Sequence, residues 1–477
     1  MSSPKSSSGL FNSTGGGAPL GGVGSTGFTP SPQPLLVTTF VALCALILGY
    51  GLAFIPPSRI LMRGSLVATS FAIILQLQLS NLRISSNAYA NNHLTVHIWL
   101  TLLRSVDLLL LKKIHIIPTL NTSSALSFYR PNVSTNSRIS RLWAAISLLL
   151  SARYIGTPWQ ISKIPHFSKS NLPYIPSRRA FLLRASVVFI ITYLLCDSFN
   201  LLDRSEATSA AFPAEHEQLF SRLSEVTIKE LIARNVATFW FAVVTVLFLT
   251  WVYNLFALVS VGSGLCPPAA WPPLFGSLSD AYTLRGFWGY VPFTSYSTSK
   301  NISWDKELVL MMKFSSYWHK LMRAVVESLA SWISTSLLRL NKGTAISKYV
   351  RIFLAFLISG ILHVTVDMEF GIPFLHSPAP RFFFMQALGI MFEEAVERAW
   401  RSYSPYSPFE IGLNGFERRR RWARWVGYGW VWAFFVWTVP SYSWEGLRIA
   451  GTRSDLAVPW SLVEWLGLKW SVSLDGM

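Results

Sequence analysis

Long apolar runs separated by short polar segments dominate the chain after residue 33. A helix needs about 20 mostly apolar residues to cross the hydrocarbon layer of a bilayer, and most of these runs approach that length. They cover residues 35–55, 64–80, 94–111, 181–199, 235–262, 351–367, 381–397 and 425–440. The pattern predicts an all-α fold, a polytopic transmembrane helical bundle with about eight spans.

A further run, residues 324–338, is shorter and more polar, so it either is re-entrant or interfacial or crosses the membrane as an additional span. The distribution of charge favours a segment that does not cross. The segment 112–180 is strongly basic and the segment 200–234 is richer in acids, as expected of a cytoplasmic and a lumenal loop. If residues 324–338 do not cross, the segment 263–350 and the basic cluster Arg418–Arg421 both lie on the cytoplasmic side.

The first 33 residues are rich in Ser, Gly and Pro and contain too little apolar surface to form a core. We predict that they form a disordered N-terminal tail and that residues 34–477 form one transmembrane domain. No internal repeat is visible, so the sequence gives no support for transporter-type symmetry.

The composition also indicates a membrane protein. Of 477 residues, 51% are hydrophobic and 13% are charged, whereas soluble domains carry about 25% charged residues. The net charge of +18 does not predict nucleic-acid binding, because the basic residues lie in short segments between apolar runs. The three cysteines form neither a disulfide framework nor a metal-ligand spacing, and no metal site is predicted.

One histidine, His363, lies inside the apolar run that begins at Arg351. An ionisable residue within a membrane segment is costly and is generally functional, although a histidine can also be hydrogen-bonded into a bundle without any catalytic role. Ser359 and Gly360 precede it by one turn, so a ligand or a neighbouring helix can approach the backbone there. Asp367 follows at i+4, where it either fixes the imidazole tautomer or only caps the helix.

Two other pairs of residues leave alternatives open. His93 and His97 have the i, i+4 spacing of a metal-binding pair, but no third ligand is evident. Glu393 and Glu394 lie late in an otherwise apolar run, where they either form an ion pair within the bundle or contact a substrate.

The segment Trp271–Gly289, WPPLFGSLSDAYTLRGFWG, contains prolines, glycines and many aromatic residues. This composition predicts an ordered loop that lies against the membrane, with Arg285 and Trp288 on a cationic and aromatic surface. The later segment YWHKLMR contributes Trp318, His319, Lys320 and Arg323. A basic pocket suits a phosphate-bearing acyl donor such as coenzyme A. Charge alone does not distinguish such a donor from anionic lipid.

Together these segments resemble the fungal, wax-synthase-like branch of the membrane-bound O-acyltransferases. The resemblance rests on WPPLFG, AYTLRGFWG, WHK and the SG-two-residues-H pattern that ends at His363. It extends to RYIGTPW upstream and to FFFMQALGIMFEEAVE and RWVGYGWVW downstream, in matching order. It implies that residues 34–477 form an acyltransferase domain of internal membranes, with the endoplasmic reticulum as the expected location. The implied co-substrate is an acyl-CoA, and no other cofactor is implied.

Acyl transfer to an alcohol needs a base that takes the hydroxyl proton and donors that stabilise the developing oxyanion. In the family that the chain resembles, the membrane-embedded histidine is the base, which assigns that role to His363. Burial in an apolar channel favours the neutral imidazole that a base requires. His319 matches the second polar position, where it either orients the donor or contributes to the oxyanion site. The residues expected to bind the acyl-CoA are Arg285, Trp288, Trp318, Lys320 and Arg323.

Residues 290–315 depart from the family pattern. The family has two residues between FWG and WH, and removing 290–315 would restore that spacing. The inserted stretch has neither an apolar period nor a motif, so it is either a retained intron in the gene model or a surface excursion. If it belongs to the protein, the convergence of Trp288 and His319 does not follow from the sequence.

Members of the branch commonly acetylate hydroxyls of terpenoid or meroterpenoid natural products. The resemblance therefore implies an acetyltransferase of secondary metabolism, with acetyl-CoA as the donor and a lipophilic alcohol that enters from the bilayer. A wax-ester or sterol-ester synthase that uses long-chain acyl-CoA is an alternative within the same class. A proton-coupled membrane transporter, in which His363 exchanges a proton, is an alternative from a different class.

Overall fold

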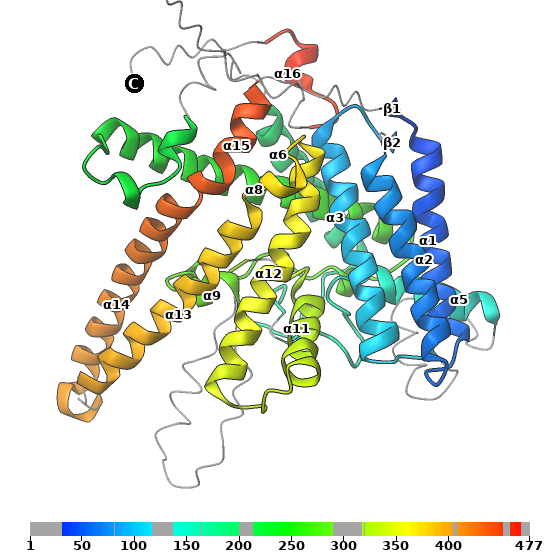
Figure 1. The fold of residues 1–477 in the computed structure, drawn as a ribbon, viewed down its shortest axis with the longest axis horizontal. Helices are drawn as coiled ribbons and strands as arrows, with labels where there is room; N and C mark the ends of the chain where they lie inside the picture. The colour runs from blue at the N-terminus through cyan, green and yellow to red at the C-terminus, as the bar shows by residue number, and fades with distance from the viewer. Residues whose placement is uncertain are drawn as a thin grey trace, which may run out of the picture.

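The computed structural model describes residues 31–80, 82–116, 137–162, 164–199, 213–289, 317–318, 320–403, 408–451 and 458–468. Their helices form a bundle in which α1, α2, α3, α12, α13 and α14 follow one another as neighbours (Figure 1). Most of the predicted N-terminal tail lies outside the described residues. Its last part contains β1 (Ser31–Pro32), which pairs in parallel with β2 (Leu82–Arg83).

Every predicted span coincides with a helix. These are α1 (Pro34–Phe54), α2 (Ile60–Leu79), α3 (Ala88–Ser105) with the π-helical turn η1 (Val106–Leu111), α6 (Arg178–Ser198), α8 (Ile228–Gly262), α12 (Ala345–Glu369), α13 (Ala379–Tyr403) and α14 (Pro408–Thr438). Among the described residues, 6 helices are long and apolar enough to cross a membrane: α1, α2, α3 with η1, α6, α8 and α12. The all-α transmembrane fold is confirmed, whereas a count of about eight spans is not.

Shorter helices connect the spans. They are α5 (Arg138–Leu150), η3 (Ala214–His216), η4 (Phe220–Arg222), η5 (Pro268–Ala270), η6 (Leu278–Asp280), α9 (Leu284–Trp288), α11 (Arg323–Trp332), η7 (Ile333–Leu337), η8 (Phe374–His376), α15 (Pro440–Gly451) and α16 (Leu462–Trp465). The run 324–338 forms α11 and η7. At 1.5 Å per residue the two together extend about 22 Å, less than the hydrocarbon layer, which agrees with a re-entrant or interfacial segment.

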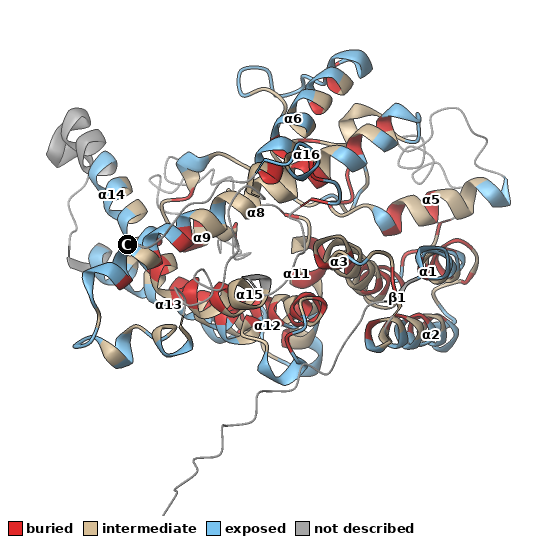
Figure 2. Cartoon of the chain, turned by 90° about the horizontal axis from the view of Figure 1, so that it is seen from above, coloured by how far each residue is buried: buried red, intermediate tan, exposed pale blue. Residues whose placement is uncertain are grey.

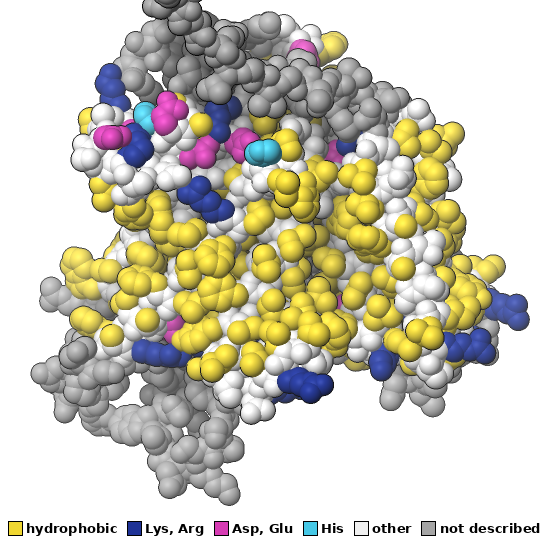
Figure 3. Space-filling model, viewed as in Figure 1, with side chains coloured by type: hydrophobic (Ala, Val, Ile, Leu, Met, Phe, Trp, Pro, Cys, Tyr) yellow, Lys and Arg dark blue, Asp and Glu magenta, His cyan; other side chains and the backbone are white. Residues whose placement is uncertain are grey.

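The outer surface is apolar over the helices. Hydrophobic side chains cover a broad band of the face in Figure 3, and most charged side chains lie above or below that band. Large side chains such as Leu61 and Leu183 are 87% and 70% exposed. A soluble protein rarely exposes so much contiguous apolar surface, and this band is the part of the molecule that faces lipid.

Buried residues gather on the sides of the helices that face one another (Figure 2). One apolar cluster joins α1, η1 and α5, where Leu48, Leu108 and Leu149 are fully buried. A second cluster joins α9, α12, α13 and α14 and includes Leu284 and Ile352. The helix that carries His363 therefore belongs to a packed layer.

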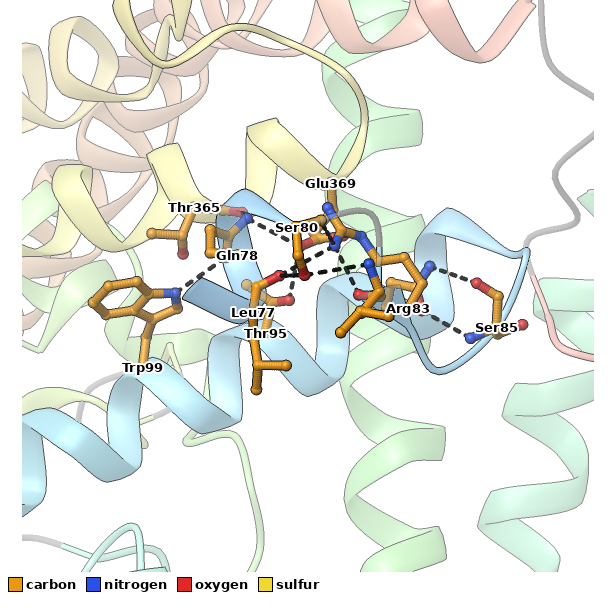
Figure 4. Close-up of polar contacts among 11 residues, drawn as sticks. Leu77, Gln78, Ser80, Arg83, Ser85, Thr95, Trp99, Thr365 and Glu369 are labelled. Atoms are coloured by element: carbon orange, nitrogen blue, oxygen red, sulfur yellow. Dashed lines mark hydrogen bonds and ion pairs between the residues drawn. The ribbon is translucent and has the colours of Figure 1, made fainter. Parts of the chain in front are cut away.

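A buried polar network joins α12 to α2 and α3 (Figure 4). Arg83 Nε lies 2.7 Å from Glu369 Oε2, and both side chains are almost fully buried. Gln78 and Thr95 each donate a hydrogen bond of 3.0 Å to Glu369 Oε1, and Trp99 Nε1 donates to Gln78 Oε1 at 3.1 Å. A buried charge requires such compensation. The network fixes the height of α12 relative to α2 and α3.

Candidate active site

A cavity of about 2330 Å³ lies within the bundle, lined mainly by apolar and aromatic side chains. Its walls come from α3, α8, α12 and α14 and from the loop Trp271–Gly289. In Figure 2, α6 lies on the opposite side of the molecule from α12 and α13, with α8 between them. Pockets for drug-sized ligands generally measure about 300–1,000 Å³. This cavity therefore has room for two substrates at once.

His363 lines the cavity from α12. Its Nδ1 lies 2.7 Å from the carbonyl oxygen of Ser359. Because a carbonyl only accepts, Nδ1 carries the proton and Nε2 is left as an acceptor, to which no described residue bonds. Phe383 of α13 lies against the ring, with 4.4 Å between centroids. The imidazole is thus held in the tautomer that a general base requires.

Asp367 does not orient this imidazole. Its Oδ2 accepts a hydrogen bond of 2.6 Å from Ser377 Oγ, in the turn that leads into α13. The orienting role expected for Asp367 belongs instead to the main-chain carbonyl of Ser359. This carbonyl lies one turn before His363, directly within reach of the ring.

Gly360, three residues before His363, allows a neighbouring helix to pack closely against α12. A Cβ on Gly360 would lie 3.1 Å from Pro380 Cα and 3.4 Å from Phe383 Cβ, tighter than most Cβ contacts. The close approach expected at this position is therefore made by α13, which brings Phe383 to the imidazole of His363.

Trp288 and Trp318 meet at the same cavity, and both line it. Their ring centroids are 5.8 Å apart, and Trp318 stacks on Phe287 at 5.2 Å. Trp288 Nε1 donates to Gln386 Oε1 of α13 at 3.2 Å. The tertiary structure therefore brings together the two tryptophans on either side of the insertion.

The backbone on either side of the insertion also meets. Trp318 N donates to Phe287 O at 2.9 Å, and Tyr317 N donates to Gly286 O at 3.3 Å. Residues 290–315 lie outside the described residues, so the choice between a retained intron and a surface excursion stays a prediction. The contact between the two flanks, however, is present in the full-length chain.

Glu393 of α13 anchors α9, which carries Trp288. Its carboxylate accepts backbone N–H groups of Leu284 at 2.8 Å and Arg285 at 3.1 Å, and Trp430 Nε1 donates to it at 3.2 Å. The first N–H groups of a helix lack intrahelical partners, and a carboxylate satisfies them well. Sequence reasoning left this role unassigned, because the groups that Glu393 binds are backbone donors of a loop far away in the chain.

Glu394, the neighbour of Glu393, forms an ion pair with Lys348 of α12 and accepts a hydrogen bond of 2.6 Å from Arg398. Of the two alternatives left open by the sequence, Glu394 therefore fits the ion pair. It links α13 to α12, the helix that carries His363.

The predicted donor-binding cations lie in different surroundings. Arg323 begins α11 and lines the cavity, and its Nε donates to Glu327 at 2.8 Å. Arg285 lies 3.6 Å from Glu397, and neither Arg285 nor the buried Lys320 belongs to the described cavity wall. His319 lies outside the described residues. Of the predicted cations, the structure thus brings Arg323 to the wall that also contains Trp288 and Trp318.

Arg153, part of the RYIGTPW segment, ties several motifs together. Its guanidinium donates to Pro273 O at 2.9 Å, to Pro272 O at 2.7 Å and to the hydroxyl of Tyr253. Tyr253 on α8 in turn donates to Pro272 O at 2.6 Å. Arg153 therefore positions the WPPLFG loop. In the sequence it was recognised only as part of the RYIGTPW motif, without a role of its own.

These features define a membrane protein with an internal apolar site, one oriented histidine and a pair of tryptophans. Residues 310–385, which include Trp318 and His363, match the model of the membrane bound O-acyl transferase family. The acetyltransferase aurG of Calcarisporium arbuscula is 30% identical over 350 residues, which cover 71% of this chain and 73% of aurG. No solved structure matches the chain.

Two further relatives carry the same kind of name. The acetyltransferase ataH of Aspergillus terreus is 29% identical over 66% of this chain and 93% of its own length. The acetyltransferase pyr8 of Aspergillus fumigatus is 29% identical over 71% of each chain. The chain belongs to the membrane-bound O-acyltransferase family, as its motifs indicated, and it is an acyl-transferring enzyme. Family membership sets aside the transporter alternative.

Proposed function

We propose that the chain is an O-acetyltransferase of secondary metabolism, which transfers the acetyl group of acetyl-CoA to a hydroxyl of a terpenoid or meroterpenoid alcohol. The observation that carries the proposal is the oriented imidazole of His363, whose Nε2 has no described partner and which lines a large apolar cavity. The names of the acetyltransferase relatives support the acetyl group, and the apolar lining supports a lipophilic acceptor. The proposed location is the endoplasmic reticulum.

In the proposed reaction, the acceptor hydroxyl oxygen attacks the thioester carbonyl carbon while His363 Nε2 takes the hydroxyl proton. A C–O bond forms and the carbonyl electron pair moves onto oxygen, giving a tetrahedral intermediate. The intermediate collapses by breaking the C–S bond, and the proton on Nε2 passes to the departing CoA thiolate. The Ser359 carbonyl accepts from Nδ1–H throughout, so it stabilises the imidazolium that exists between the two steps.

The surroundings of the cavity support two separate entry routes. Arg323 provides a cation in the wall near the tryptophan pair, as the phosphate-bearing donor requires. Consecutive residues of α8, from Val236 to Leu249, all line the cavity. Consecutive residues point in all directions around a helix, so the cavity reaches both sides of α8. Val236 and Phe239 of this stretch are more than half exposed, so the cavity meets the outer apolar surface at α8, as an acceptor that enters from the bilayer requires.

The proposal is tested with microsomes that express the wild-type chain, His363→Ala or His166→Ala. Labelled acetyl-CoA and a panel of terpenoid alcohols are supplied. We expect acetylation by the wild type and a loss of about 10²–10⁴-fold in His363→Ala, because the base is removed. His166 has an exposed side chain outside the cavity wall, so His166→Ala is the matched control.

Two outcomes would contradict the proposal. Activity with palmitoyl-CoA but none with acetyl-CoA would replace it with the wax-ester or sterol-ester synthase. Full acetylation by His363→Ala would remove His363 from the role of base while leaving the reaction itself in place.

A further inference from the structure

A second histidine in the cavity wall is held in the same way as His363. His97 on α3 lines the cavity, and its Nδ1 lies 2.8 Å from the carbonyl oxygen of His93, four residues earlier. Because the carbonyl accepts, Nδ1 donates and Nε2 is left as an acceptor. No described residue bonds to this Nε2. The cavity therefore contains two oriented imidazoles, one more than proton removal from a single hydroxyl needs.

Aromatic rings lie beside His97 and the neighbouring His93, and the buried Arg104 of the same helix also lines the cavity. Phe256 of α8 lies with its ring centroid 5.6 Å from that of His97, and Phe248 lies 3.8 Å from His93. The i, i+4 pair of His93 and His97 has no third metal ligand among the described residues, which contain no group of three or more His, Cys, Asp or Glu that could hold an ion. An acceptor nitrogen in such a wall gains most from a ligand that donates a hydrogen bond to it.

The imidazoles of His97 and His363 belong to different parts of the cavity wall. His97 of α3 lies against Phe256 of α8, with ring centroids 5.6 Å apart, whereas His363 of α12 lies against Phe383 of α13, with ring centroids 4.4 Å apart. Each imidazole is held by a carbonyl oxygen of its own helix. Each Nε2 therefore offers a separate acceptor position to a ligand in the cavity.

We propose that His97 binds the acceptor through a second hydroxyl, which donates to Nε2 while the reacting hydroxyl lies at His363. The inference rests on the proposed acetyltransferase function and narrows its acceptor to a rigid, lipophilic skeleton with two hydroxyls. A fatty alcohol or a monohydroxy sterol lacks the second group. Binding at two points determines which hydroxyl faces the thioester, so His97 is a specificity-determining residue that selects the site of acetylation.

The test compares a terpenoid diol with its monodeoxy analogue, which retains the reacting hydroxyl. His97→Phe keeps a ring but removes the acceptor nitrogen, and His97→Gln keeps an acceptor oxygen. With the diol, we expect His97→Phe to raise KM about tenfold with little change in kcat and to produce a mixture of monoacetylated regioisomers. With the monodeoxy analogue, wild type and His97→Phe should have the same KM. His97→Gln should recover part of the wild-type KM and regioselectivity.

The comparison of two acceptors within one variant does not depend on how much enzyme is folded. His166→Phe, at an exposed position outside the cavity wall, is the matched control for the substitution. Equal effects of His97→Phe on both acceptors, or unchanged KM and regioselectivity with the diol, would overturn the inference. So would a loss of kcat on both acceptors like that of His363→Ala, because it would place His97 in the chemical step.

A failure of the proposed function gives a different result. In that case the wild type acetylates none of the acceptors. Binding of the diol to the purified wild type in detergent then tests His97 by itself. Binding that is weaker in His97→Phe for the diol and unchanged for the monodeoxy analogue supports the inference, and binding that is equal in both proteins for both compounds overturns it.

Discussion

At the scale of single residues, the orientation of the His363 ring depends on a main-chain carbonyl. A partner of this kind cannot be recognised in a sequence. The sequence identified His363 from its place in an apolar run, and the structure places it in the wall of a large cavity. It suggested Asp367 as the tautomer partner, yet Ser359 O fills that role. Every residue has a carbonyl, so no side chain marks the one that matters. The same reason hid Glu393, whose partners are backbone N–H groups.

Glu393→Gln is predicted to loosen α9. An amide has one acceptor oxygen where the carboxylate has two, so one of the donors of Leu284, Arg285 or Trp430 loses its partner. We expect a loss of about 1–3 kcal/mol of stability, together with reduced acetyl transfer. Thermal unfolding in detergent and the acetylation assay measure the two effects.

Glu397→Gln is the control for that change. Glu397 lies 3.6 Å from Arg285 with about a third of its side chain exposed, and exposed pairs contribute about 0–1 kcal/mol. Equal destabilisation by the two variants would contradict the anchoring role of Glu393.

At the scale of elements, the length of the apolar runs was enough to locate the helices, because a long apolar run rarely forms anything other than a membrane helix. The sequence did not predict α5 (Arg138–Leu150), since the basic residues of segment 112–180 favoured a loop. In the structure the apolar side of α5 packs against α1, with Ala145 and Leu149 fully buried. The π-helical turns η1 and η7 had no signal in the sequence, because they arise where packing adjusts the end of a helix.

The docking of α14 against the loop that leads into α9 depends on a glycine. A Cβ at Gly427 would lie 2.2 Å from Tyr282 O, a distance that real structures do not show. Gly427→Ala is therefore predicted to displace the loop that carries Trp288 and to lower acetyl transfer strongly. Gly429 lies in the same helix, and apart from its own helical turns no described atom lies within 4 Å of the position that its Cβ would take, so Gly429→Ala is the matched control. Alanine favours helix over glycine, so a loss of activity in both variants would count against the steric explanation.

The network around Glu369 gives a second prediction for the elements. Glu369→Gln leaves the buried guanidinium of Arg83 without its counter-charge, which costs about 3–5 kcal/mol in buried pairs. Thermal unfolding in detergent should show a large drop in Tm, and Arg83→Met in the same chain should recover part of it. Glu225, whose side chain is 68% exposed beside Arg222, supplies the control, since Glu225→Gln should change stability by less than about 1 kcal/mol. A small effect of Glu369→Gln would show that the network does not hold α12.

At the scale of the whole molecule, the order of the motifs indicated the family, but only the tertiary structure shows how the motifs meet. Trp288 and Trp318 are separated by the insertion in the sequence and are 5.8 Å apart between ring centroids. Their convergence is accompanied by main-chain hydrogen bonds from Trp318 to Phe287 and from Tyr317 to Gly286, and the insertion hid this contact in the sequence.

Deletion of residues 290–315 is predicted to preserve the site, because the flanking backbone groups are already hydrogen-bonded to one another. We expect acetyl transfer by the deletion variant at a rate at least equal to that of the full chain, measured in matched microsomes. Reading the transcript across the junction separates a retained intron from a surface excursion. An inactive variant with normal thermal unfolding would show that the inserted residues contribute to the reaction.

The volume of the cavity has a consequence for the order of events. A cavity of about 2330 Å³ has room for the thioester end of the donor and the whole acceptor together, so we expect the acetyl group to pass directly between them. Transfer through a ternary complex gives initial-rate lines that intersect when both concentrations are varied, whereas a covalent acyl-enzyme gives parallel ones. In a ternary-complex mechanism, label should not exchange between acetyl-CoA and free CoA before an alcohol is bound. Acetyl-CoA should therefore not be lost through hydrolysis of an acyl-enzyme while no alcohol is present.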